Sequence, residues 1–89
     1  MHDMTLEDAR AAEASPHAAS AEELFQLGLN YSLGAGCMAD LVTAQKWLSL
    51  AALKGSIAAR ICRRVLAEEM TPSDIAEAQR QAGSWIRPH

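Results

Sequence analysis

Residues 27–55 read LGLNYSLGAGCMADLVTAQKWLSLAALKG, and this stretch predicts two helices that fold back on each other. The first helix has an apolar face at i, i+3, i+4, i+7 spacing, formed by Leu24, Leu27, Gly28 and Tyr31. Gly34 and Gly36 tolerate the positive φ at which helices commonly end, and Asp40 offers a side-chain oxygen to cap the second helix. We therefore expect a helical hairpin to be the centre of the fold.

Eleven residues of this hairpin form an ordered pattern at fixed spacing. They are Leu27, Gly28, Tyr31, Gly34, Gly36, Asp40, Ala44, Trp47, Ala51, Ala52 and Gly55. The pattern resembles the Sel-one-like repeat, a relative of the tetratricopeptide repeat. The resemblance implies an all-α fold of tetratricopeptide-like antiparallel helical hairpins, a fragment of an α-α superhelix. It also implies a non-catalytic adaptor for protein–protein interaction that is bacterial and cytoplasmic.

The repeat does not recur in the next stretch of the chain. One period later, Arg63 and Arg64 stand at the positions of Leu27 and Gly28, so the diagnostic residues are missing. Because an isolated helix pair cannot bury its apolar faces, residues 56–86 are predicted to form a hairpin that caps the single repeat.

About four helices are predicted within a domain of residues 20–89. Their expected ranges are 21–33, 41–54, 57–69 and 72–86. Ser20 and Glu23 have the spacing of a capping box, and Thr71 precedes a proline that suits the first position of a helix. Residues 1–19 are predicted to be a mobile acidic arm or a short helix.

The apolar patterns of two helices predict how they pack. Phe25, Leu29 and Leu33 form a second apolar row on the first helix, which we expect to pack on the third helix. A groove or a subunit contact is the alternative for this row. The third helix is predicted to turn an apolar face inward, formed by Ala58, Ile61, Cys62, Val65 and Leu66.

The outer side of the third helix carries three arginines, Arg60, Arg63 and Arg64, which form either a solvated face or a site for an acidic or phosphate-bearing partner.

The formal charge of the chain is −3. Residues 1–19 contain four acids and one base, and residues 20–89 contain seven of each, so the domain is neutral (7 − 7 = 0). This balance argues against a general nucleic-acid binder. A nucleic-acid-associated regulator that uses the arginine helix is nevertheless the main alternative function.

No catalytic, cofactor or metal site is predicted. The three histidines, His2, His17 and His89, lack the spacing of metal ligands. Cys37 and Cys62 are expected to be reduced thiols, because the sequence has no secretory signal and no membrane-spanning segment. A small thiol enzyme centred on Cys37 is a third alternative.

The partner is expected to be an unidentified protein, with homo-oligomerisation as a further option and with no membrane contact. The residues proposed to bind it are Phe25, Leu29, Leu33, Arg60, Arg63 and Arg64.

Overall fold

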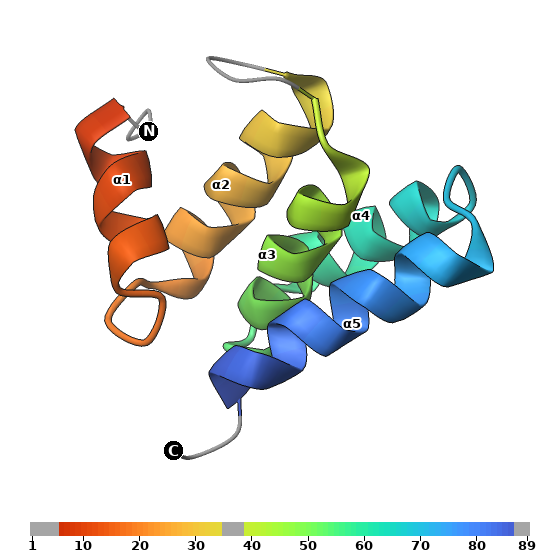
Figure 1. The fold of residues 1–89 in the computed structure, drawn as a ribbon. Coiled ribbons are helices and arrows are strands. Elements are labelled where there is room, and N and C mark those ends of the chain that lie inside the picture. The colour runs from red at the N-terminus through yellow and green to blue at the C-terminus, as the bar shows by residue number, and fades with distance from the viewer. Residues whose placement is uncertain (1–5, 35–38, 87–89) are drawn as a thin grey trace.

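The computed structural model describes residues 6–34 and 39–86, which form helices joined by short turns and loops. Its helices are α1 (Leu6–Ala14), α2 (Ala21–Leu33), α3 (Leu41–Leu53), α4 (Ile57–Ala67) and α5 (Pro72–Ile86) (Figure 1). No strand occurs in the described ranges, so the predicted all-α class is confirmed. None of the helices there is long and apolar enough to cross a bilayer.

The predicted helix ends are present. Ser20 caps α2 with a capping box, in which its hydroxyl accepts from the Glu23 amide at 3.0 Å and its own amide donates to the Glu23 carboxylate at 3.0 Å. Gly34 ends α2 with φ 71°, the left-handed conformation that glycine adopts at little cost. Asp40 caps α3 by accepting from the Thr43 amide at 3.1 Å. The rest of the predicted turn, including Gly36 and Cys37, lies outside the described residues.

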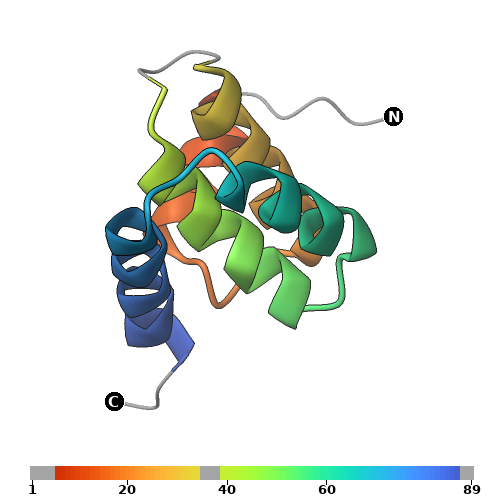
Figure 2. The same ribbon diagram turned by 90° about the vertical axis from the view of Figure 1, so that its right-hand side faces the viewer.

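The central helix of the fold is α3, because α2, α4 and α5 all pack against it (Figures 1 and 2). Its buried residues are Ala44, Gln45, Trp47, Leu48, Ser49, Leu50 and Ala51. A helix that is covered on several sides needs apolar or small residues around most of its circumference, which this sequence supplies.

Helices α4 and α5 lie on opposite sides of α3 (Figure 2). Each contacts α3 much more than it contacts the other, whereas α2 and α3 form a close antiparallel pair. This arrangement differs from the capping hairpin expected for residues 56–86. One side of α4 consequently has none of the described helices packed on it.

Gly28 lies where α2 crosses α3. A Cβ atom at this position would lie 2.7 Å from Leu48 Cδ2 and 3.3 Å from the carbonyl oxygen of Ala44. Only a residue without a side chain allows the two backbones to approach this closely. The close packing at the crossing therefore offsets the destabilising effect of a glycine within a helix. The apolar face predicted for the first helix of the hairpin, which includes Gly28, therefore packs on the second helix.

The N-terminal helix α1 packs against α2, and the loop that follows it is held by α3 and α5. The Lys54 ammonium donates to three carbonyl oxygens of this loop, those of Pro16 (2.8 Å), His17 (3.0 Å) and Ala19. The His17 ring also meets the Trp85 ring edge to face at 5.8 Å between centroids. Charge-assisted hydrogen bonds and a ring contact thus join segments that are far apart in the sequence.

Candidate interaction surface

Helix α4 is turned differently from the sequence-based expectation. Ala59 is its buried residue, while Cys62 and Leu66 are half-buried against the core. Three large apolar side chains are exposed on its outer side: Ile57 (70%), Ile61 (60%) and Val65 (60%). The prediction that Ala58, Ile61 and Val65 face inward is therefore wrong, because α5 packs on the far side of α3 and leaves this side of α4 uncovered.

The second apolar row of α2 is only partly covered. Phe25 packs against the core and Leu29 is half-buried, but Leu33 is 77% exposed. The row points toward the side of the molecule on which α4 lies, since Leu29 and two residues of α4, Ile61 and Val65, line one groove. Its outer end is thus not covered by the third predicted helix.

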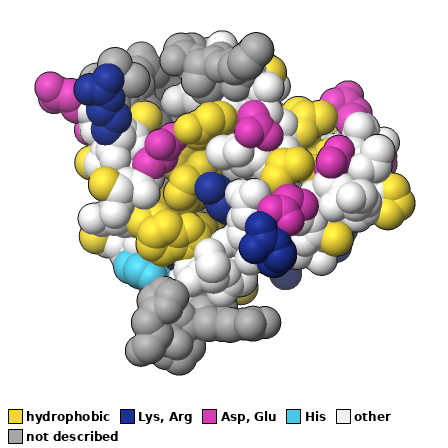
Figure 3. Space-filling view, viewed as in Figure 1, with side chains coloured by type: hydrophobic (Ala, Val, Ile, Leu, Met, Phe, Trp, Pro, Cys, Tyr) yellow, Lys and Arg dark blue, Asp and Glu magenta, His cyan; other side chains and the backbone are white. Residues whose placement is uncertain are grey.

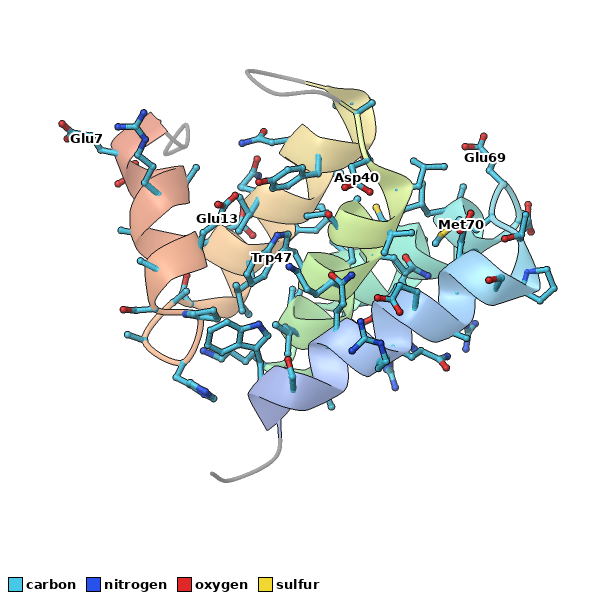
Figure 4. The ribbon with its side chains drawn as sticks, viewed as in Figure 1. Glu7, Glu13, Asp40, Trp47, Glu69 and Met70 are labelled. Atoms are coloured by element: carbon cyan, nitrogen blue, oxygen red, sulfur yellow. The ribbon has the colours of Figure 1, made fainter. Side chains whose placement is uncertain are left out.

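The groove between α2 and α4 has a volume of about 230 Å³. Its walls are Leu29, Ser32, Leu48, Ile61, Cys62, Val65, Leu66 and Glu69. Figure 4 shows Glu69 pointing away from the molecule at the end of α4, while Met70 turns inward. Leu33 of α2 and Ile57 of α4 do not line the groove but are exposed on the same two helices. We call the apolar side chains of these helices at and beside the groove the α2–α4 surface, defined by Leu29, Leu33, Ile57, Ile61 and Val65.

The three arginines of the predicted group differ in their exposure. Arg60 and Arg64 are exposed beside the apolar row of α4. Arg63 is half-buried, and its backbone carbonyl accepts a hydrogen bond from Gln45 Nε2 of α3 at 3.0 Å. Within the described part of the chain, the side chains of Arg60, Arg64 and Glu68 make neither hydrogen bonds nor ion pairs. Two cations and one carboxylate are therefore available next to the α2–α4 surface.

A second hollow, of about 270 Å³, lies below the α1–α2 loop. Its lining residues are Pro16, His17, Leu24, Leu50, Leu53, Lys54 and Trp85. The polar groups at this hollow already interact with one another or with the loop, since Lys54 binds the loop carbonyls and His17 meets Trp85. The loop, α3 and α5 thus account for its polar contacts, and we regard it as a structural junction.

The face of the molecule seen in Figure 3 carries both apolar and charged side chains. Hydrophobic side chains gather in the middle of this face, with acidic and basic side chains among them (Figure 3). The Tyr31 hydroxyl donates to the Glu13 carboxylate, and the Lys46 ammonium lies 4.3 Å from the Trp47 ring centroid. Burial lowers the pKa of Lys46, and the charges of Glu13 and Asp40 oppose that shift. Trp47 itself is buried, on the side of α3 that faces α2 (Figure 4).

Two buried polar atoms have no hydrogen-bond partner in the described structure, Trp47 Nε1 and Gln45 Oε1. Each costs about 1–3 kcal/mol of stability. Neither of them lines the two hollows.

The described residues do not form a cluster of metal-binding side chains. Cys62 is a free, half-buried thiol, and no group of three metal-binding side chains exists among the described residues. His2, Cys37 and His89 lie outside those residues.

The sequence-based prediction missed the exposed row of Ile57, Ile61 and Val65 as a surface feature. The available signal was its i, i+4, i+8 spacing next to a second apolar row, Cys62 and Leu66, on the same helix. A helix with two apolar rows needs two neighbours, and α4 has only one row against α3.

Comparisons with known proteins give no further assignment: no protein-family model, no curated protein and no solved structure matches this chain.

Proposed function

We propose that this protein is a non-catalytic protein-interaction module of the Sel-one-like repeat type, which binds its partner through the α2–α4 surface. The observation that carries the proposal is the exposed apolar row of α4, Ile57, Ile61 and Val65, beside a groove that already contains Leu29. Isolated exposed apolar residues are common, but a contiguous row at the rim of an apolar groove is typical of a binding surface.

The chemistry of the surface defines the partner. Ile61 and Val65 occur one helical turn apart, so a partner helix with apolar residues at the same spacing can pack against them. Arg60 and Arg64 lie beside the row with no carboxylate partner in the described structure. The complementary partner is therefore an amphipathic helix whose apolar face is flanked by carboxylates.

Site-specific photocrosslinking in cell extract tests the proposal. A photoreactive amino acid is introduced at Ile61 or at Leu33, and the control position is Gln79, which is exposed on α5 away from the surface. We expect discrete crosslinked protein products from positions 61 and 33 but not from position 79. Adding Val65→Asp, which places a charge on the same row, should abolish the products while circular dichroism shows unchanged helix content.

The proposal is wrong if position 79 gives the same products or if Val65→Asp leaves them unchanged. Repeating the crosslinking at increasing salt concentration distinguishes the nucleic-acid alternative from apolar protein binding. Binding led by phosphate contacts of Arg60 and Arg64 would weaken steeply with salt and yield products sensitive to nuclease, whereas apolar binding would persist.

A further inference from the structure

We infer that α1 and the loop that follows it, residues 6–19, form a strap that opens as one unit from the rest of the fold, with Lys54 as its latch. The strap is separate from the proposed interaction surface, because α1 and α4 lie on different sides of the α2–α3 pair (Figures 1 and 2). Three observations carry the inference: the small apolar contact of the strap, its attachment by a few surface hydrogen bonds, and the hollow beneath its loop.

The strap contacts the rest of the fold through small side chains. Its described apolar residues that are buried are Ala12, Pro16 and Ala19, and Ala9 packs partly against the same core. Hydrophobic stabilisation scales with the apolar area removed from water, so these residues contribute less than the buried leucines of α2 and α3. The apolar attachment of the strap is therefore weaker than the attachment between α2 and α3.

Hydrogen bonds near the surface hold the strap at both of its ends. In α1, the Glu13 carboxylate accepts a hydrogen bond from the Tyr31 hydroxyl. In the loop, the Lys54 ammonium donates to three carbonyl oxygens. Lys54 is an exposed residue, so water replaces these hydrogen bonds when the loop leaves, and their net contribution is modest. One side chain thus holds the whole loop.

The two parts of the strap are coupled to each other. An isolated helix of nine residues, the length of α1, is not stable in water, so α1 unfolds once it leaves α2. The Ser15 amide donates to the Ala11 carbonyl oxygen of α1 at 3.0 Å, and the Ser15 carbonyl oxygen accepts from the Ala18 and Ala19 amides at 3.0 and 3.1 Å. The turn of the loop is therefore continuous with the last turn of α1, and the two should open together.

Opening of the strap uncovers apolar side chains of the core. The hollow of about 270 Å³ has Pro16 and His17 of the loop on one side and Leu24, Leu50 and Trp85 on the other. Leu24 and Leu50 are buried while the strap is closed. Side chains that face a void lack part of their packing contacts, which reduces the free energy that opening costs. The strap is thus a conformational switch between a covered and an exposed state of these side chains.

Amide hydrogen exchange, followed by NMR in the full chain, tests the inference. The samples are the unaltered chain, Lys54→Met, Tyr31→Phe and the control Gln79→Met, which changes an exposed side chain of α5. In the unaltered chain, the protection factors of the strap amides should be similar to one another. They should also be lower than those of the buried part of α3 by about tenfold or more, as expected for local opening.

The variants test whether the strap opens as one unit. Lys54→Met removes the donor to the loop, and Tyr31→Phe removes the donor to α1. Each should lower the protection factors of both Ala12 in α1 and Ala19 in the loop, by about tenfold for Lys54→Met, because charge-assisted hydrogen bonds are lost. The protection factor of Leu48 in α3 should stay unchanged, and Gln79→Met should alter none of the three.

Three results overturn the inference. If Ala12 exchanges as slowly as Leu48 in the unaltered chain, α1 opens only when the whole domain unfolds. If Lys54→Met affects Ala19 but not Ala12, or Tyr31→Phe affects Ala12 but not Ala19, α1 and the loop open separately. If Lys54→Met lowers the protection of Leu48 by the same factor as that of Ala19, Lys54 stabilises the whole domain and is not a latch.

Discussion

Helices α4 and α5 both pack on α3, yet they differ in how completely α3 covers their apolar residues. In α5, Ala78 and Ala82 are buried, and every described large apolar side chain is at least half-buried. In α4, Ala59 is buried but three large apolar side chains are exposed. Small residues thus make the contact with α3 in both helices, and the difference lies in what each helix carries on its other sides.

It follows that an amphipathic pattern does not by itself identify the buried face of a helix. Ile75 and Trp85 of α5 lie close enough to its alanine face to be partly covered by α3 and the α1–α2 loop. Ile57, Ile61 and Val65 of α4 lie on the side away from Ala59, which none of the described helices covers. The large apolar residues of α5 are thus partly covered within this fold, whereas three of those on α4 are exposed, which is the feature on which the proposed interaction surface rests.

The largest effect that tests this comparison is expected from a charge introduced on the buried side of α5. Ala78→Asp should reduce the free energy of unfolding by about 3–5 kcal/mol, because it places an unpaired carboxylate against α3. Urea denaturation followed by circular dichroism measures the loss. A change below about 1 kcal/mol would show that α5 is not packed on α3 as described.

The next effect extends the comparison to two helical glycines, one in a tight contact and one in open space. Gly28→Leu should destabilise the protein by about 1–3 kcal/mol through overpacking against Leu48. Gly83→Ala is the matched control, since a Cβ atom there meets nothing within 4 Å, and it should stabilise α5 by up to about 1 kcal/mol. Thermal unfolding distinguishes the two signs, and a raised melting temperature for Gly28→Leu would contradict the assigned crossing.

A smaller effect is expected on the uncovered side of α4. Ile61→Asp should change the free energy of unfolding by less than about 1 kcal/mol in dilute solution, because most of this side chain is already in water. The same urea denaturation applies, with Ala78→Asp as the reference. A loss as large as that of Ala78→Asp would mean that Ile61 belongs to the core.

The smallest effect concerns the acid stability of α5. Hydrogen bonds from Arg80 and then from Gln81 lower the pKa of Glu77 from its ordinary value of 4.5 to about 2. Since the folded pKa lies below the ordinary one, the contribution of Glu77 is present above pH 4.5 and is lost as the pH falls toward 2. The effect should be small and sensitive to salt, because the pair is exposed.

Thermal melts between about pH 5 and pH 2 measure this contribution, with the range set by the two pKa values of Glu77. Glu77→Gln cannot lose a charge, so its melting temperature should fall less steeply over this range than that of the unaltered chain. Identical slopes for the two proteins would show that the Glu77–Arg80 pair does not stabilise α5.

Local structure was predictable from the sequence because it depends on neighbouring residues. Ser20 and Asp40 cap helices where their spacing predicts, and Gly34 ends α2 in the left-handed conformation. Gly28, which the sequence places on the apolar face of the first helix of the hairpin, lies at the α2–α3 crossing. Of the residues of the proposed α2–α4 surface, Leu29 and Leu33 were candidates from the sequence, whereas Ile57, Ile61 and Val65 were not.

The all-α class, the helix ends and the close pairing of α2 with α3 follow from the sequence alone, because capping, glycine conformation and helical periodicity act over a few residues. The side of α3 on which α5 packs, and with it the exposure of Ile61 and Val65, is set by tertiary contacts instead. The buried residues of α3 extend around most of the helix and include the polar Gln45 and Ser49, so the apolar periodicity of α5 does not identify the side on which it packs. The choice depends on contacts between residues far apart in the sequence, such as those of α5 with α3 and of Trp85 with His17 in the α1–α2 loop, which no local pattern contains.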